Sequence, residues 1–158
     1  MEPTKRRTTP TPDELRIWRE YLETSSAVSA RLAERMQRES ALSSADYTVL
    51  LALSEASAHT LRSSEVATRI GWERSRVSHH LGRMEKRGLI RREACNDDSR
   101  GSDVILTDTG SDAFRRGSVP HLRDIHELFV RALTPAQLAA AADIAGALRV
   151  HLASIDHA

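Results

Sequence analysis

The fold is decided by residues 63–107, which read SSEVATRIGWERSRVSHHLGRMEKRGLIRREACNDDSRGSDVILT. The stretch begins with a short helical pattern that ends at Gly71, a residue suited to the left-handed end of a helix. A second pattern comes next, with apolar residues at spacings of four and three: Val77, Leu81 and Met84. Gly88 ends this second pattern after a basic last turn. Two helices joined by a tight turn that contains glycine predict a helix-turn-helix, whose second helix can lie in the major groove of DNA.

The face of the second helix opposite its apolar stripe carries donors and cations that suit DNA. These residues are Ser75, Arg76, Ser78, His79, Arg83 and Lys86. Arginine can bind guanine through two hydrogen bonds, while serine and histidine can reach base edges or phosphates. A solvated surface is the more common explanation for an isolated basic helix, so the segment C-terminal to this helix decides between the two interpretations.

A β-hairpin is predicted directly after the second helix. Two β-prone runs, 89–94 and 103–107, flank a segment rich in Asn, Asp, Ser and Gly. A hairpin in this position is a wing. Arg100 at its tip fits a narrow minor groove, where the negative potential of DNA is strongest. Asp98 is expected to hold the Arg100 guanidinium by a charge-assisted hydrogen bond.

These features resemble the MarR family of winged helix-turn-helix transcriptional regulators. The wing pattern carries the resemblance: Asp98-Ser99-Arg100, then after five residues Leu106-Thr107, with Gly110 a few positions later. With the flanking helices, the resemblance covers about residues 13–151. Many members have a second arginine where Ser99 stands, so one phosphate contact of the wing is missing from this chain. The resemblance implies a homodimer knitted together by its terminal helices, a double-stranded inverted-repeat operator, and repression as the commoner mode.

A small-molecule effector is also implied by the resemblance. MarR-like proteins usually bind small aromatic or phenolic anions where the dimer helices meet the DNA-binding lobe, and the ligand releases the protein from DNA. The candidates for such a cleft here are Trp18, Tyr21 and Tyr47, although each also fits a simple core role. Release would be a population shift, because the ligand must bind the DNA-incompetent conformation better.

The expected architecture is mainly α with a small β-hairpin wing, an α+β fold. A disordered basic tail (1–10) precedes a winged helix-turn-helix domain (43–107), and helices of a dimerisation region flank that domain (11–38 and 108–158). The first helix, about 25 residues long, would span about 37 Å. That is more than so small a lobe can cover, so part of it is expected to contact a second subunit.

Local signals predict where the other helices begin and end. Capping patterns at Thr11, Ser43, Thr107 and Thr134 predict four helix starts. Residues 54–60 read as a small-residue loop, and the last helix is expected over 138–152. Pro120 is expected to kink or break the helix that begins after Thr107.

The composition is that of an ordinary soluble globular protein, with 40% hydrophobic and 28% charged residues. No apolar run is expected to approach the ~20 residues that cross a bilayer, and no signal peptide is expected. A cytoplasmic protein without a membrane partner is therefore expected. Residues 60–100 contain ten Lys or Arg and six Asp or Glu, a balance of +4 that leaves −3 for the rest. Positive charge gathered in the predicted DNA-binding lobe is typical of phosphate binding.

Other functions are disfavoured by the residue pattern. Cys95 is the only cysteine, which excludes an intramolecular disulfide, and a small turn residue is a better interpretation than a redox sensor. His79 and His80 should point about 100° apart, so they would not chelate one metal ion easily. Without a phosphate loop, zinc-finger spacing or nucleophile elbow, no enzyme and no cofactor or metal is expected. The alternative is an architectural DNA-binding protein that ignores small molecules.

Overall fold

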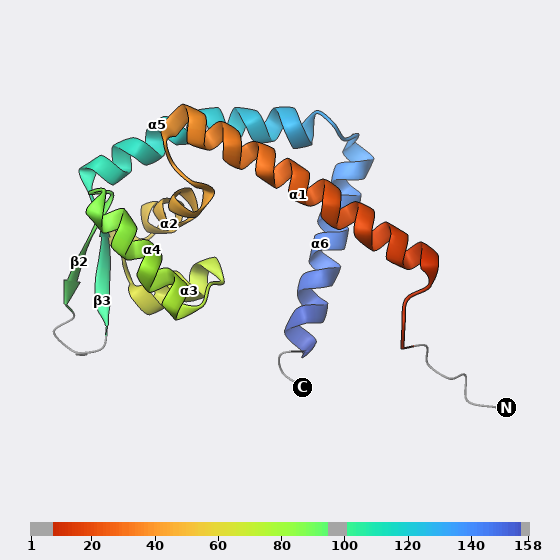
Figure 1. Cartoon of the computed structure of the whole chain (residues 1–158), viewed down its shortest axis with the longest axis horizontal. Helices are drawn as coiled ribbons and strands as arrows, with labels where there is room; N and C mark the ends of the chain where they lie inside the picture. The colour runs from red at the N-terminus through yellow and green to blue at the C-terminus, as the bar shows by residue number, and fades with distance from the viewer. Residues whose placement is uncertain (1–7, 95–100, 156–158) are drawn as a thin grey trace.

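Six α-helices and a three-stranded sheet make up residues 8–94 and 101–155, the parts of the chain that the computed structural model describes (Figure 1). The elements come in this order: α1 Pro12–Ser40, α2 Ser44–Ser54, a 3₁₀ turn Ser57–His59, β1 Thr60–Arg62, α3 Ser63–Ile70, α4 Arg74–Lys86, β2 Ile90–Ala94, β3 Ser102–Leu106, α5 Asp108–Ile125, a π-helical turn His126–Val130, and α6 Pro135–Ile155. This order confirms the predicted α+β class with a small wing.

Side-chain caps fix the helix starts at the four predicted positions. At α1, the Glu14 amide donates to Thr11 Oγ1 at 3.2 Å and the Thr11 amide donates to Glu14 Oε2 at 2.7 Å. The same reciprocal pair joins Ser43 and Asp46 at α2, and equivalent bonds start α6 at Thr134. Each cap satisfies donors that the first helical turn leaves free, which is why short sequence motifs predict helix starts well.

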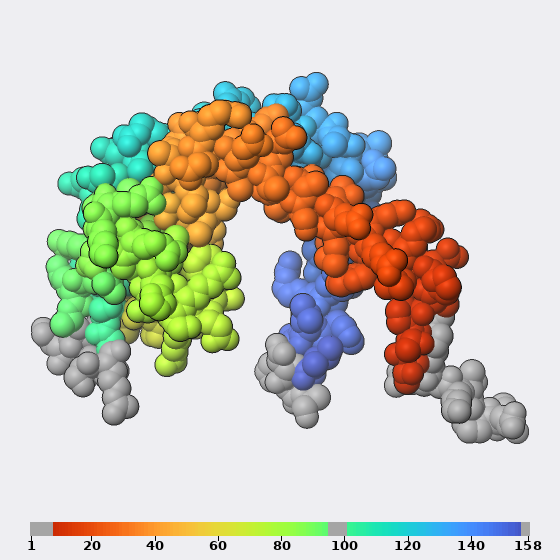
Figure 2. Space-filling view, in the orientation of Figure 1, coloured from red at the N-terminus to blue at the C-terminus, as the bar shows by residue number. Residues whose placement is uncertain are grey.

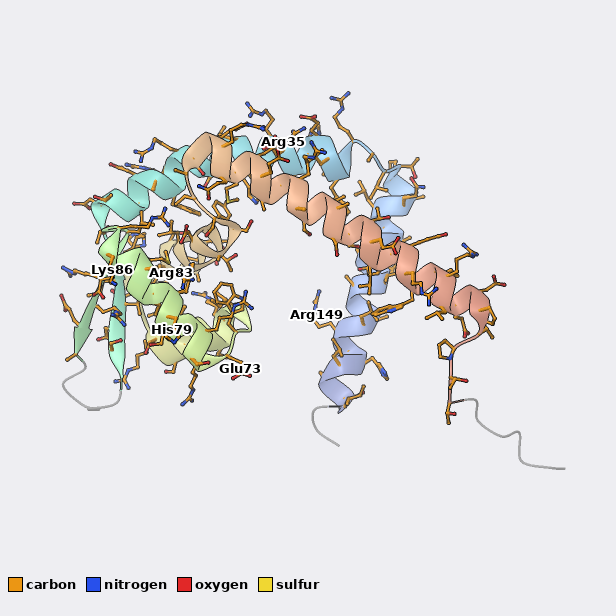
Figure 3. All side chains as sticks on the ribbon, viewed as in Figure 1. Arg35, Glu73, His79, Arg83, Lys86 and Arg149 are labelled. Carbon is orange, nitrogen blue, oxygen red and sulfur yellow. The ribbon has the colours of Figure 1, made fainter. Side chains whose placement is uncertain are left out.

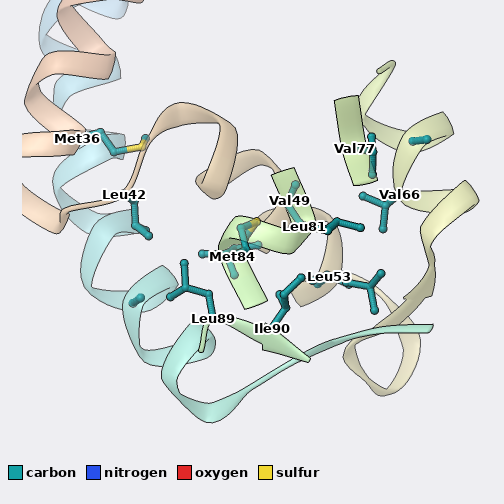
Figure 4. Close-up of a cluster of buried hydrophobic side chains, with 14 residues drawn as sticks. Met36, Leu42, Val49, Leu53, Val66, Val77, Leu81, Met84, Leu89 and Ile90 are labelled. Carbon is teal, nitrogen blue, oxygen red and sulfur yellow. The ribbon is translucent and has the colours of Figure 1, made fainter. Parts of the chain in front are cut away.

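The hydrophobic core lies where α2, α3, α4 and the sheet meet (Figure 4). The apolar stripe predicted on α4 is buried here: Val77, Leu81 and Met84. Val49, Leu50 and Leu53 of α2 cover it from the other side and are fully buried. Each such side chain contributes about 1.5–3 kcal/mol when it leaves water. This core therefore fixes how α4 is oriented, and which face of α4 remains outside.

The sheet is antiparallel, in the order β1-β3-β2. The predicted hairpin is confirmed as β2 and β3, but the prediction of a plain loop over residues 54–60 is incomplete. That segment forms the 3₁₀ turn and leads into β1, which pairs Leu61 with Val104 of β3. A strand of three residues is too short to show alternation in the sequence, and its identity depends on the distant partner strand.

Pro120 was predicted to kink or break the helix after Thr107, and the break does not occur. Helix α5 continues through Pro120 to Ile125, and the irregularity comes later, as the π-helical turn. Contacts with α1 and α2 support α5 along its length. Arg35 of α1 donates to Asp124 at 2.8 Å and to Glu127 at 3.0 Å. These contacts offset the backbone hydrogen bond that proline cannot make.

Thr107 joins the wing, the end of α4 and the start of α5. Its hydroxyl donates to the Gly88 carbonyl at 2.6 Å and accepts from the Gly110 amide at 3.0 Å. The backbone is so close at this point that a Cβ on Gly110 would overlap the Leu89 carbonyl oxygen. Only glycine fits this position without displacing the backbone.

The terminal helices leave a large apolar surface uncovered. Helix α6, all of which the structure describes, has no buried residue. Figure 2 shows open space between α6 and the lobe of α2, α3 and α4. The expectation that no apolar run reaches bilayer length is wrong for α6, which qualifies by length and by a mean hydropathy of 1.4. The helix also extends beyond the predicted 138–152 at both ends.

Candidate nucleic-acid interface

The helix-turn-helix is formed by α3 and α4, and its turn has the predicted glycine end. Gly71 has φ +67°, the left-handed region, and the Trp72 amide donates back to the Ala67 carbonyl at 3.0 Å. Glycine adopts this conformation without the strain that a Cβ would cause. The chain can therefore reverse within three residues and place α4 across the front of the lobe.

One face of α4 is exposed and polar along its whole length. The six predicted residues all lie on this exposed face: Ser75, Arg76, Ser78, His79, Arg83 and Lys86. Figure 3 labels His79, Arg83 and Lys86 on successive parts of the helix. Neighbouring His80 is 95% buried, so the two adjacent histidines do point apart. The structure thus brings together the six candidates on α4, and their contact with DNA stays a prediction.

The other two DNA-contact candidates, Asp98 and Arg100, lie outside the described residues. The same holds for Cys95 and for the basic residues 5–7 of the N-terminal tail. What the structure describes of the wing is its two antiparallel strands, β2 and β3 (Figure 1).

A row of contacting side chains, Trp72, Arg76, His80 and Arg83, follows one edge of α4 at helical spacing. The Arg76 guanidinium lies 4.0 Å from the centre of the Trp72 ring. That ring meets His80 edge to face at 5.5 Å and 77°. Arg83 Nη2 then donates to His80 Nδ1 at 2.9 Å. Trp72 also packs on the core, so it braces the turn between α3 and α4.

Asp46 anchors the far end of α4 to α2. It is 2% exposed, and Arg87 Nη1 donates to its Oδ2 at 2.7 Å. Its Oδ1 lies 3.2 Å from His80 Nε2, near enough for attraction but without hydrogen-bond geometry. Burial would raise the pKa of Asp46, but the bonds from Arg87 and Ser43 outweigh it and hold that pKa below its ordinary value.

His80 remains neutral near pH 7 in this setting. Burial lowers the pKa of His80, Asp46 raises it, and the cations of Arg83, Arg87 and Arg76 lower it further. Since Arg83 can only donate, Nδ1 must be the acceptor and Nε2 carries the proton.

A second brace connects α4 to the wing. Arg92 of β2 donates to Glu85 three times: from its amide to Oε1 at 3.1 Å, and from Nε and Nη2 to Oε2 at 2.9 and 2.6 Å. The hydrogen bonds from Arg92 lower the pKa of Glu85, so this carboxylate is charged throughout the neutral range. Both side chains are about two-thirds buried.

Sequence reasoning missed a basic groove between α4, the start of α3 and the strands of the wing. It has a volume of about 620 Å³ and a floor of Val77 and Leu81. Three cations from three different elements line it: Arg62, Arg74 and Arg92. The signal in the sequence was the local charge of +4, but a charge count does not say which cations meet at one place.

The three aromatic ligand candidates do not meet within one chain. Trp18 and Tyr21 lie on the outer half of α1 and are 54% and 50% exposed. Tyr47 belongs to α2, which lies near the C-terminal end of α1 (Figure 1), and it packs against Phe114 at 5.2 Å and His121 at 4.7 Å. A shared site would therefore need a second copy of the chain.

Comparisons with known proteins agree on one family. The model of the MarR family matches residues 42–101. Sco3205 of Streptomyces coelicolor, a MarR family transcriptional regulator solved in complex with DNA, is 32% identical and similar over 90% of each chain, with a TM-score of 0.84. AbsC, another MarR family transcriptional regulator of that organism, is 30% identical over 94% of this chain and 99% of its own, also with a TM-score of 0.84.

The S. coelicolor regulator PcaV, solved in complex with its natural ligand, is 25% identical over 94% of this chain and 97% of its own, with a TM-score of 0.67. A comparison with curated protein sequences finds no match.

These similarities extend over both the DNA-binding lobe and the terminal helices. They confirm the predicted winged helix and the prediction that the protein is not an enzyme. The chain belongs to the MarR family of DNA-binding transcriptional regulators.

Proposed function

We propose that this protein is a cytoplasmic repressor that binds an inverted-repeat operator as a homodimer. The observation that carries the proposal is the continuous exposed polar face of α4, with six potential contacts beside a groove lined by three arginines. The helix has the means to read base edges, and the groove has the charge to hold a phosphate strand.

The dimer is supported by the uncovered terminal helices. A 21-residue helix with no buried residue gains little from its own chain, so the apolar side chains of α6 need a partner surface. A second copy offers the same surface in return, through a two-fold axis. Two recognition helices would then meet half-sites about 34–36 Å apart on one face of the duplex.

We infer that a small aromatic or phenolic anion releases the protein from DNA. Trp18, Tyr21 and Tyr47 are the proposed contacts, and the dimer is what would bring them together. PcaV, solved with its natural ligand, supports an effector site in a protein of this family. In a Trp72→Phe variant Trp18 is the only remaining tryptophan, so its fluorescence can follow titration with benzoates and phenols.

The specific regulator and the architectural alternative differ in DNA selectivity. Fragments that the protein retains from a genomic library should share one palindrome, bound about 10³-fold or more tightly than bulk DNA at the same salt concentration. Similar affinity for all fragments, with no effect of any aromatic anion, would favour the architectural protein. A monomer in sedimentation at micromolar concentration would contradict the dimer and the palindrome together.

A further inference from the structure

The stripe Trp72, Arg76, His80, Arg83 and Arg87 recurs at spacings of four, four, three and four, which places these residues along one edge of α4. Within it, aromatic rings alternate with guanidinium groups. Trp72 is in contact with both Arg76 and His80, and His80 is in turn bonded to Arg83. Two exposed arginines on the proposed DNA face are thus connected through two less exposed rings.

We propose that Trp72 and His80 are positioning residues for DNA binding, which hold the guanidinium groups of Arg76 and Arg83 at fixed places on α4. This inference rests on the proposed function of the α4 face.

The geometry leaves both arginines available to DNA. A guanidinium stacked on a ring contacts it through its flat face, whereas its five N–H donors point outward in the plane. Arg76 therefore keeps its donors while its long side chain is restrained by Trp72. Arg83 uses one nitrogen for His80 and has donors left for a base or a phosphate.

Restraint of this kind strengthens binding because less side-chain freedom is lost when the complex forms. The His80 ring is itself fixed, because it is 95% buried and lies against Asp46 of α2. Both guanidinium groups are therefore held in place by contacts with rings that pack on the core, and they do not move freely in solvent.

The first test uses the full chain and the duplex that the wild-type protein enriches most strongly from random sequence. Trp72→Leu should weaken binding by about two- to fivefold, the range of an exposed cation–π contact. In an Arg76→Ala background the same change should add no further loss. Trp72→Phe, which keeps a ring, should lose less than Trp72→Leu.

The second test removes the acceptor for Arg83. His80→Leu should weaken binding by about two- to tenfold, the range for one hydrogen bond, and should add nothing in an Arg83→Ala background. His80→Gln retains an acceptor and should recover part of the loss. As the pH falls through the lowered pKa of His80, the protonated ring can no longer accept from Arg83, so the advantage of wild type over Arg83→Ala should shrink.

The Arg76→Ala and Arg83→Ala backgrounds separate two hypotheses: that Trp72 and His80 position the arginines, and that this face of α4 binds DNA. If Trp72 and His80 variants fold with unchanged thermal stability and bind like wild type, while Arg76→Ala and Arg83→Ala bind weakly, the positioning role is wrong and the DNA face stands. Equal losses from Trp72→Leu in both backgrounds also overturn the role, since they indicate a general effect on the fold. If Arg76→Ala and Arg83→Ala bind as tightly as wild type, the proposed DNA face itself is wrong.

Discussion

Replacing Glu85 by Gln should have opposite effects on specific and non-specific DNA. Glu85 is an acidic group at the end of the proposed recognition helix, so simple repulsion predicts that its removal strengthens all DNA binding. However, Glu85 also holds the wing to α4 through three hydrogen bonds from Arg92. The outcome depends on which of these two effects is larger for each kind of DNA.

The magnitudes can be compared. A hydrogen bond to a charged group contributes about 1.5–3 kcal/mol when buried, but a pair that is about one-third exposed must be discounted towards the 0–1 kcal/mol of surface pairs. We therefore expect the brace to contribute about 1–2 kcal/mol to the alignment of wing and helix. One cation released to contact a phosphate contributes about 1 kcal/mol near 0.15 M salt, which corresponds to about fivefold in affinity.

The loss should dominate where alignment matters. If the enriched duplex engages α4 and the wing together, the net loss of about 0–1 kcal/mol should make it bind Glu85→Gln up to about fivefold more weakly at about 0.15 M salt. An unrelated duplex of equal length needs only charge and should bind up to about fivefold more tightly. Fluorescence anisotropy titrations of both duplexes over a range of salt concentrations measure the two effects.

Glu93→Gln is the matched control. Glu93 lies on β2 next to Arg92, but it pairs with Arg91 on the same strand, and both side chains are largely exposed. Its loss removes a charge without releasing the wing from α4, so both duplexes should bind slightly more tightly. The reasoning is refuted if Glu85→Gln behaves like Glu93→Gln on both duplexes.

Two further predictions concern stability. Gly110→Ala should destabilise the fold by about 1–3 kcal/mol in thermal or urea denaturation because the new Cβ overlaps the Leu89 carbonyl; Gly82→Ala, on α4 with open space around it, should be neutral or stabilising, and equal effects of the two changes would contradict the close approach. Asp46→Asn should cost about 1–3 kcal/mol at pH 7, because it leaves Arg87 without its charged partner. The pKa of Asp46 is lowered in the fold, so its contribution to stability is complete above the ordinary value of 3.8 and is lost as the pH falls through the lowered pKa. The free energies of unfolding of the variant and of wild type should therefore converge in acid. A constant difference down to pH 2 would show that Asp46 acts through packing alone.

Much of the fold was predictable because its signals are local. Caps at Thr11 and Thr134 need only three or four residues, and the stripe of α4 repeats within a few turns. Gly110 belongs to the wing pattern of the family, and the structure supplies the reason for glycine there in the nearby Leu89 carbonyl. Strand β1 could not be predicted in this way, since it exists only through its pairing with β3.

In the candidate site, too, the features with local sequence signals were predictable and those that depend on tertiary contacts were not. Periodicity alone separated the exposed residues of α4 from its buried stripe, but it did not show that His80 lies on the edge of that stripe and bonds to Arg83. The groove of Arg62, Arg74 and Arg92 joins residues that are up to 30 positions apart in the sequence, so it depends on tertiary structure. The helix does not break at Pro120, because a propensity ignores support from neighbouring helices.

The Thr107 hydroxyl, which bonds to Gly88 and to Gly110 at once, has a mechanical consequence. Flexing the chain between the wing and α5 would break both bonds, so we expect the winged lobe and α5 to move together as one rigid body. In a two-fold assembly, the distance between the two DNA-binding lobes would then depend on the angle between the axes of the two α5 helices. A molecule that increased this angle would displace both DNA-binding lobes along the duplex together, without deforming the wing itself.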